Sequence, residues 1–428
     1  MSQKKIKQLR KLAVKKRRDL RLLFNTNAPH AGSGYSVEMR DVLYRLVEDG
    51  WPIAISAFYG VDGGPTDIEY PGNLNPRLKG LVIKHYPRMS EAWGSDGMFH
   101  HGKDWKTHAV FSMQDIWTLD PAFLSKIPVW IPWFPVDKEP LPINVIQKLT
   151  FAYKIMCFSK FGHKLLLDAG FAAQLLLEGI DVDIFKPMDK FEMRKQLEIP
   201  QDRFLFFVVG ANKENPPRKG FQESLAAFKM FSDKHPEASI LLTSQQRAPT
   251  GFPIKEYAQY LGILPKIFFV DDYKSIWTTS SNEMAQQYSA CDATLHPSQT
   301  EGFGLCIVES QACGRPVIIQ NCQSMPELII EGKTGFGAKT LYERFTSDLS
   351  FVNVADPQSV YECMEKTYEL VKKNPNKVTN DCRNWVVENF NVDTLVKNEW
   401  IPMLCDLQDE LLPLTDSTKV GTVNSPKQ

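Results

Sequence analysis

Short apolar runs alternate with amphipathic segments along most of the chain, and this alternation limits the fold more than any other feature of the sequence. The runs at 20–24, 53–58 and 204–209 predict buried strands. Apolar residues at helical spacing over 37–46 and 221–235 predict helices that cover those strands. Further strands are expected at 81–85, 109–113, 129–133 and 155–158, near Ile240 and near Ile267. Strands that alternate with helices favour parallel sheets, so the sequence predicts an α/β fold.

A chain of 428 residues is too long for one ordinary hydrophobic core, so two Rossmann-like domains are expected. The predicted parts are a basic N-terminal arm at 1–19, a first domain at 20–180, a linker at 181–200, a second domain at 201–384, a C-terminal helix at 385–412 and a disordered tail at 413–428. The tail is expected to be disordered because its apolar content is low.

A glycine-containing loop follows the first strand of each half and leads into a helix. The first loop is Gly-Ser-Gly at 32–34, and the second spans 210–220. In open parallel sheets, ligands bind beyond the carboxyl ends of the strands, so the two domains are expected to face each other across a cleft. Two cations at a helix N-terminus are unfavourable without an anion, so Arg218 and Lys219 indicate an anionic ligand. The alternatives are tight turns for the glycines and a solvated charge pair in a mobile loop.

Two glutamates stand eight positions apart within 296–316, on either side of a Gly-Phe-Gly turn that opens an apolar, helix-periodic run. Glycines that bring backbone N–H groups to a helix N-terminus form a site for an anion such as phosphate. Glu301 lies before the turn and Glu309 lies about two turns inside the helix, so each can bind a different polyol. A sugar at one end, a ribose at the other and a diphosphate between them describe a nucleotide-sugar.

These motifs resemble the group 1 glycosyltransferases, a large family of retaining enzymes with the GT-B fold that includes bacterial mannosyltransferases and sucrose synthase. The resemblance rests on the Glu-x7-Glu block, on Gly-x-Pro-Val at 314–317, on Pro326-Glu327 and on the segment 179–187, and it covers 22–405. It implies a GT-B fold, in which two Rossmann-like domains face each other across a cleft. It also implies a retaining hexosyltransferase whose donor substrate is a nucleotide-diphosphate sugar and which needs no metal and no cofactor.

The resemblance also implies a role for each motif residue. Glu301 binds hydroxyls of the transferred sugar, Glu309 binds the ribose, and Lys219 neutralises the diphosphate, whose developing negative charge fixed cations and amides stabilise. Gly34 lets the first-domain loop close over the diphosphate, and the backbone N–H groups of 303–305 approach it. The predicted donor-binding residues are Gly32, Gly34, Gly210, Arg218, Lys219, Glu301, Phe303, Gly304, Leu305 and Glu309, and the predicted catalytic residues are Glu301, Lys219 and Asp115.

The second-domain loop departs from the family pattern at one position. The family commonly has an Arg soon after the glycine that ends the strand, whereas this chain has Gly-Ala-Asn-Lys at 210–213. Either Arg218 or Lys213 could take the place of that cation.

The Asp-Val-Asp sequence at 181–183 is similar to the metal-binding Asp-x-Asp of the other glycosyltransferase fold. It lies in the linker motif, where loop and helix-cap residues are the favoured interpretation. No metal site is therefore predicted.

The acceptor side of the cleft is less constrained by the sequence. Asp115 stands where the family often presents a His or Asp towards the sugar, so it is the candidate for contacting the acceptor hydroxyl, with a helix cap as the alternative. Trp130, Trp133, Phe134 and Asp137 could line the cleft, although core packing explains the aromatic residues equally well. A glycan, a lipid-linked sugar and a protein all stay open as the acceptor.

Basic charge is concentrated at the N-terminus, where residues 1–21 carry ten Lys or Arg and only Asp19 as an acid. This arm favours contact with an anionic membrane surface over nucleic acid, and a solubilising tail is the alternative. Eight scattered cysteines and the lack of a signal segment favour a cytoplasmic protein with peripheral membrane contact. The alternative function is a non-catalytic nucleotide-sugar-binding scaffold that the arm recruits to membrane or nucleic acid.

Overall fold

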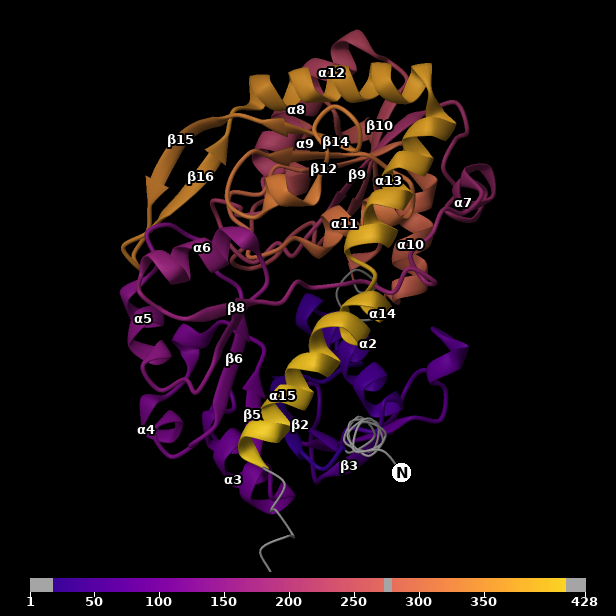
Figure 1. Ribbon diagram of the computed structural model, residues 1–428. Coiled ribbons are helices and arrows are strands. Elements are labelled where there is room, and N and C mark those ends of the chain that lie inside the picture. The colour runs from indigo at the N-terminus through magenta and orange to yellow at the C-terminus, as the bar shows by residue number, and fades with distance from the viewer. Residues whose placement is uncertain (1–17, 273–278, 413–428) are drawn as a thin grey trace, which may run out of the picture.

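The computed structural model describes residues 18–272 and 279–412 and contains two large β-sheets, each with helices packed on it (Figure 1). The predicted tail at 413–428 and the arm at 1–19, apart from its last two residues, lie outside the described residues. No helix in the described ranges is long and apolar enough to cross a membrane.

The first sheet has eight strands in the order β3-β4-β2-β1-β5-β6-β7-β8. All neighbours are parallel except β3 and β4, and Leu22 of β1 lies opposite Ile53 of β2 and Ala109 of β5. The strands are β1 (Leu22–Asn27), β2 (Ile53–Tyr59), β3 (Thr66–Glu69), β4 (Val82–Tyr86), β5 (Ala109–Ser112), β6 (Trp130–Phe134), β7 (Ile155–Cys157) and β8 (Ala173–Leu175). Its helices are α2 (Gly34–Glu48), α3 (Ser95–Trp105), α4 (Pro121–Leu124), α5 (Ile143–Leu149) and α6 (Lys160–Asp168).

The second sheet has six parallel strands in the order β11-β10-β9-β12-β13-β14. The strands are β9 (Phe204–Val209), β10 (Ala238–Thr243), β11 (Ile267–Phe269), β12 (Ala293–His296), β13 (Val317–Gln320) and β14 (Gly335–Ala338). Its helices are α7 (Lys190–Gln196), α8 (Phe221–Lys234), α9 (Ile254–Tyr260), α10 (Ser281–Ala290), α11 (Leu305–Ala312), α12 (Pro357–Lys373) and α13 (Pro375–Asn389). The predicted α/β architecture with largely parallel sheets is confirmed.

A two-stranded antiparallel ribbon lies outside both sheets and was not expected from the sequence. It consists of β15 (Thr340–Phe345) and β16 (Phe351–Ala355), inserted between β14 and α12. Figure 1 shows the ribbon extending from the second half of the chain towards α5 and α6 of the first half.

The segment after α13 returns to the first sheet as several pieces rather than as one helix. It forms α14 (Val392–Leu395), a π-helical turn and α15 (Ile401–Leu411), and Figure 1 shows α15 lying over the first half. Trp400 joins the core there, with ring centroids 4.9 Å from Trp133 and 6.1 Å from Phe111. The C-terminal segment therefore contributes to the hydrophobic core of the N-terminal half.

A buried arginine joins the two places where the chain crosses between the halves. Arg45 of α2 donates to Asp181 Oδ2 at 2.7 Å and to Asp393 Oδ1 at 2.7 Å, and only 2% of its side chain is exposed. The two crossings also pair with each other, because Ile180 N donates to Phe390 O at 2.9 Å and Val392 N donates to Ile180 O at 3.1 Å.

Asp181 shows what the Asp-Val-Asp sequence does. Its Oδ1 accepts from the backbone of Asp183 at 2.9 Å and of Ile184 at 3.3 Å, while its Oδ2 binds Arg45. These contacts are those of a loop residue that caps a turn and pairs with a buried cation, in agreement with the interpretation made from the sequence.

Replacing Arg45 by alanine is expected to destabilise the protein by about 3–5 kcal/mol, because it leaves Asp181 buried without its cation. Chemical denaturation monitored by tryptophan fluorescence measures the change. Arg77→Ala is the matched control: Arg77 also contacts Asp393 but is 45% exposed, so its loss is expected to cost less than about 1 kcal/mol. Equal effects of the two variants would contradict the importance of the buried pair.

Candidate functional site

Glu301 lies at the centre of a charged cluster between the two halves. Its Oε1 accepts from Lys219 Nζ at 2.5 Å and from His296 Nε2 at 2.9 Å, and Arg218 Nη1 lies 3.6 Å from its Oε2. Arg218 Nη1 also donates to Thr300 O at 2.7 Å. The sequence left Arg218 and Lys213 open as the second cation; the structure places Arg218 in the cluster and leaves Lys213 exposed.

Backbone geometry brings these side chains together at the carboxyl end of β12 and the start of α8. Gly220 has a φ of 66°, and a Cβ there would lie 2.1 Å from Pro297 O, so only glycine lets the two loops approach so closely. A Cβ on Gly210 would lie 3.1 Å from Lys219 Cγ, so the stem of Lys219 passes over this glycine. The predicted glycines of the second loop therefore position Lys219 towards Glu301.

The charges in the cluster fix the protonation of its members. Burial alone would raise the pKa of Glu301, but Lys219 and then Arg218 hold it well below its ordinary value. Burial lowers the pKa of His296, so its neutral ring can donate from Nε2 to Glu301. Glu301 is therefore an ionised acceptor at neutral pH, surrounded by donors.

The turn after Glu301 presents backbone donors next to the cluster. In the part of the chain that the structure describes, no partner is found for the N–H groups of Phe303 and Gly304. Leu305 is the first residue of α11, where backbone N–H groups have no partner inside the helix. Three neighbouring amides at a helix N-terminus are suited to an anion.

Glu309 lies in α11 behind this turn and is 9% exposed. Its Oε2 accepts from Tyr288 at 2.8 Å, and within 18–272 and 279–412 no partner is found for Oε1. Burial raises the pKa of Glu309 to about 7. One carboxylate oxygen thus stays available, as the predicted contact with a ribose requires.

The first glycine loop faces the same turn from the other half. Gly32 and Gly34 are exposed at the start of α2, where Ser33 caps the helix by accepting from Ser36 N at 3.2 Å. A Cβ on Gly34 would lie 3.5 Å from Leu305 Cδ1, which is an ordinary contact. The protein alone therefore does not require a glycine at position 34, and its closure over a diphosphate stays a prediction.

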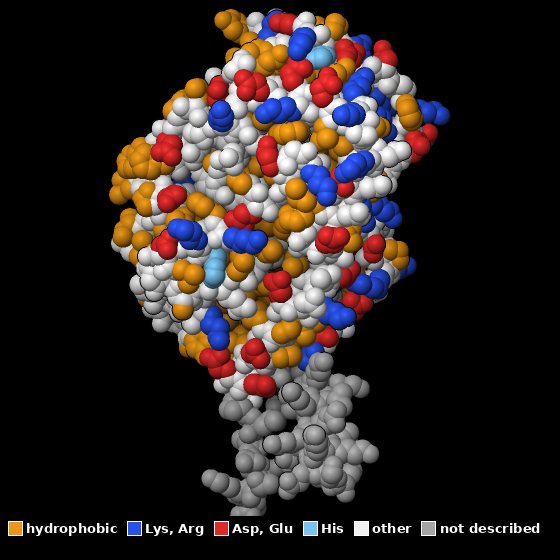
Figure 2. Space-filling view, turned by 45° about the horizontal axis from the view of Figure 1, so that its top comes forward, with side chains coloured by type: hydrophobic (Ala, Val, Ile, Leu, Met, Phe, Trp, Pro, Cys, Tyr) orange, Lys and Arg blue, Asp and Glu red, His pale blue; other side chains and the backbone are white. Residues whose placement is uncertain are grey.

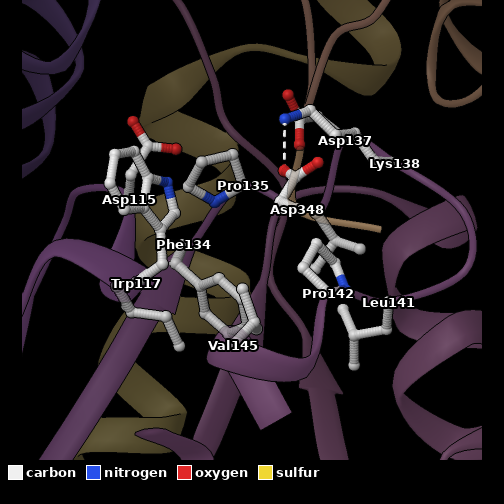
Figure 3. A pocket seen from close by; sticks show the side chains of 12 residues that line it. Asp115, Trp117, Phe134, Pro135, Asp137, Lys138, Leu141, Pro142, Val145 and Asp348 are labelled. Carbon is white, nitrogen blue, oxygen red and sulfur yellow. Dashed lines mark hydrogen bonds and ion pairs between the residues drawn. The ribbon is translucent and has the colours of Figure 1, made fainter. Parts of the chain in front are cut away.

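Asp115 lines a small cavity beside the cluster. Figure 3 shows Asp115 and Trp117 on one side of this cavity and the Lys138–Asp348 pair on the other. The cavity has a volume of about 40 Å³, which admits water but no sugar ring. Its remaining lining residues are Ile116, Phe134, Pro135, Val136, Asp137, Leu141, Pro142 and Val145.

The surroundings of Asp115 argue against the helix-cap alternative. Its side chain makes no capping hydrogen bond to the 3-10 turn that follows it (Ile116–Thr118) and accepts instead from Tyr35 at 3.3 Å. Burial raises the pKa of Asp115, and burial raises the pKa of Asp137 to about 6. Two carboxylates thus face one cavity close to Arg218, whose charge lowers the pKa of both.

The aromatic residues at 130–134 divide between the two interpretations that the sequence left open, which are lining of the cleft and packing in the core. Trp130 and Trp133 are buried at 0% and 1% exposure; Trp130 donates to Ser112 Oγ and Trp133 to Leu176 O. Phe134 is also buried but lines the cavity with Asp137. Core packing thus explains the tryptophans.

Glu38 and Glu178 are two buried carboxyl residues that the sequence analysis missed. Glu38 Oε1 accepts from Gly179 N at 3.2 Å, while its Oε2 has no hydrogen-bonding partner among the described residues. Burial, and then Glu178, raise the pKa of Glu38 well above its ordinary value. Burial, and then Glu301, raise the pKa of Glu178 to about 8. The signal in the sequence was a carboxylate directly after the apolar run at 175–177.

The two halves touch directly around the site. A Cβ on Gly302 would lie 2.3 Å from Pro135 Cβ, and Thr300 Oγ1 donates to Asp137 O. Glu327 accepts from Lys160 N at 2.8 Å and from Phe161 N at 2.5 Å at the start of α6. The motif residues therefore lie at the interface between the halves.

Within the described ranges, no group of three or more His, Cys, Asp or Glu side chains is arranged to hold a metal ion. Asp181 is the first aspartate of the Asp-Val-Asp sequence, and its Oδ2 accepts hydrogen bonds from Arg45 and Asn75.

Residues 189–343 match the family model of the glycosyl transferases group 1, so this part of the chain is a group 1 glycosyltransferase domain. The match contains Lys219, Glu301 and Glu309, and the resemblance inferred from the motifs is confirmed.

Curated relatives are similar over a limited part of their length. A D-inositol 3-phosphate glycosyltransferase of Streptosporangium roseum is 27% identical over 157 residues, which are 37% of this chain and 36% of the relative. A protein of the same name from Mycobacterium leprae is 30% identical over 162 residues, covering 37% of this chain and 34% of the relative. The chain thus matches about a third of the length of these relatives.

Solved structures resemble nearly the whole chain in fold. Sucrose-phosphate synthase from Thermosynechococcus elongatus aligns with a TM-score of 0.68 at 16% identity, covering 92% of this chain and 99% of that structure. Anabaena HepE in complex with UDP-glucose aligns with a TM-score of 0.64 at 15% identity, covering 91% and 100%. The fold is GT-B, as predicted.

The raised pKa of Glu178 predicts a pH-dependent loss of stability. Because its folded pKa is about 8 against an ordinary value of 4.5, folding disfavours the charged carboxylate, and stability is lost as pH rises from about 4.5 towards 8. Glu178→Gln mimics the protonated form, so this variant is expected to have a higher melting temperature than the unsubstituted protein at pH 8 and an equal one at pH 4.5. Thermal melts across this range test it, and parallel pH profiles would contradict it.

Proposed function

We propose that the chain is a retaining, metal-independent glycosyltransferase that transfers a hexose from a nucleotide-diphosphate sugar to an acceptor hydroxyl of a glycan, lipid or protein. The observation that carries the proposal is the cluster in which Lys219, Arg218 and His296 surround the ionised Glu301. A carboxylate among donors can bind sugar hydroxyls, while cations and helix-terminal amides can bind the diphosphate.

The chemistry of transfer fits this distribution of charge. As the bond between sugar and diphosphate breaks, negative charge grows on the leaving group and positive charge grows on the sugar ring. Lys219 and Arg218, which lie at Glu301, and the amides of 303–305 would stabilise the leaving group electrostatically. Because Glu301 holds both cations in the protein alone, donor binding would exchange their ion pairs with the carboxylate for contacts with the diphosphate.

The cavity at Asp115 supports an acceptor site next to the donor site. Asp115 and Asp137 line one cavity, and the charge of Arg218 in the cluster lowers the pKa of both. A carboxylate there can accept a hydrogen bond from the attacking hydroxyl and so orient it. Since the cavity is too small for a sugar ring, acceptor binding requires the two halves or the lining side chains to move.

The names of the relatives suggest which substrates to test first. Because HepE was solved with UDP-glucose, this donor heads a panel of uridine, guanosine and adenosine diphosphate sugars. Because the curated relatives are named for D-inositol 3-phosphate, this compound belongs among the first acceptors.

Thermal shift with the donor panel in the presence of EDTA tests the donor site. One donor is expected to raise the melting temperature of the unsubstituted protein and of Lys213→Ala, and to have little effect on Lys219→Ala, which lacks the cation nearest Glu301. With that donor, the activation free energy of transfer is expected to rise by about 3 kcal/mol in Lys219→Ala or Glu301→Ala, so turnover falls about 100-fold.

Two outcomes would count against the proposal. No stabilisation by any donor would favour a non-catalytic scaffold. Turnover that EDTA abolishes and a divalent cation restores would overturn metal independence. Anomeric analysis of the product by NMR decides whether the configuration is retained.

A further inference from the structure

The ribbon β15–β16 carries a strip of exposed apolar side chains. Phe345, Leu349 and Phe351 are 58%, 57% and 37% exposed, and we refer to them as the apolar strip. Phe345 and Phe351 are directly opposite each other, with ring centroids 5.1 Å apart. Figure 2 shows hydrophobic side chains gathered along the side of the molecule on which Figure 1 places the ribbon.

The opposite face of the ribbon is packed along β16 and hydrogen-bonded at Arg344 of β15. Val352 and Val354, which alternate with Phe351 along β16, are 3% and 6% exposed. Arg344 donates to Gln299 Oε1 at 2.9 Å, and Asn353 N donates to Gln299 O at 3.0 Å. The ribbon therefore has a fixed orientation that keeps the apolar strip outward.

The turn of the ribbon is attached to the first half beside the candidate acceptor cavity. Lys138 Nζ donates to Asp348 Oδ2 at 2.6 Å, Phe351 N to Glu139 O at 2.9 Å and Ser350 Oγ to Pro140 O at 2.7 Å. Asp348 lines the cavity that also contains Asp115. Leu349, the next residue, begins the apolar strip, so the strip starts at the cavity.

A second exposed apolar side chain flanks the cavity from the first half. Trp117 lines the cavity and is 53% exposed, and Figure 3 shows it across the cavity from Asp348. Trp117 and the turn of the ribbon therefore flank the cavity that contains Asp115. A molecule that enters between them can place a hydroxyl at Asp115 and the rest of its length against the apolar strip.

The size of the strip favours a hydrocarbon chain over a protein partner. Three side chains with these exposures offer roughly 250 Å² in total, taking about 150–250 Å² for a whole aromatic side chain. A stable protein interface needs about 800 Å² from each partner. A face two strands wide, with strands about 4.8 Å apart, matches the width of an extended alkyl chain.

We propose that the ribbon forms the outer wall of the acceptor site and that the apolar strip binds the hydrocarbon part of a lipid-borne acceptor. This inference rests on the proposed function and narrows its acceptor from a glycan, lipid or protein to an amphiphile. The polar head of the acceptor enters beside Asp115 and Trp117, and its alkyl chain follows Leu349, Phe345 and Phe351 along the ribbon.

Alkyl glucosides of different chain length test the strip with the full chain. Octyl glucoside below its micellar concentration is expected to bind at least ten-fold more tightly than methyl glucoside, measured by isothermal titration calorimetry. The double variant Phe345→Ser/Leu349→Asn is expected to lose this difference, because it removes two apolar side chains of the strip. Asparagine is chosen at position 349 because it tolerates the positive φ of 63° there. The matched control is Phe191→Ser/Tyr260→Ser, two side chains that are 62% and 85% exposed on α7 and α9 of the second half, and it is expected to keep the difference.

Each other outcome overturns the inference. Equal affinities of the two glucosides for the unsubstituted protein, or an unchanged difference in the ribbon variant, would exclude a chain-binding strip. Sedimentation showing a dimer that the ribbon variant dissociates would assign the strip to a second copy of the chain. Stabilisation by the donor, measured in the same variant, reports on the proposed function separately, because the ribbon substitutions do not touch Lys219 or Glu301.

Discussion

The relation between the two halves depends on the ion pairs of Arg45 with Asp181 and Asp393. Taking an arginine out of water is costly unless carboxylates compensate it, so the three residues hold α2, the first crossing and the returning C-terminal segment in one arrangement. The cluster at Glu301 depends on the relative position of the halves, because its surroundings come from both of them. Glu38, four residues beyond the loop at 32–34, is also held to the first crossing through Gly179 N.

The candidate site combines an ionised cluster with buried carboxyl groups whose pKa is raised. Glu301, Lys219 and Arg218 form a compact group of fixed charge, whereas Glu38, Glu178, Asp115 and Asp137 are carboxyls whose pKa burial raises. Glu178, whose pKa burial raises to about 8, is protonated at neutral pH and can donate a hydrogen bond, whereas the ionised Glu301 can only accept them. Environment rather than residue type assigns these roles, as is general for titratable groups in active sites.

Local patterns in the sequence were sufficient for the sheets and for the motif residues. Buried strands such as Phe204–Val209, and the spacing of Glu301 and Glu309, can be recognised from a short stretch of neighbouring residues. The ribbon was missed because β15 mixes charged and aromatic residues without the alternation of a half-buried strand. Tyr35 and Glu178 were missed because their neighbours Asp115 and Glu301 are distant in sequence. The C-terminal stretch was expected to be a single helix, but the crossing at Phe390–Asn391 interrupts it.

The pairing of Ile180 with Phe390 and Val392 has a mechanical consequence. Both connections between the halves pass through one place, so a rotation of one half relative to the other turns about a line through that place. Displacement in such a rotation grows in proportion to distance from the line. In Figure 1 the turn of the ribbon lies at the opposite edge of the interface from α14, which begins at Val392. The contacts of Asp348 and Phe351 with 138–140 are therefore the first to separate when the cleft opens and the last to form when it closes.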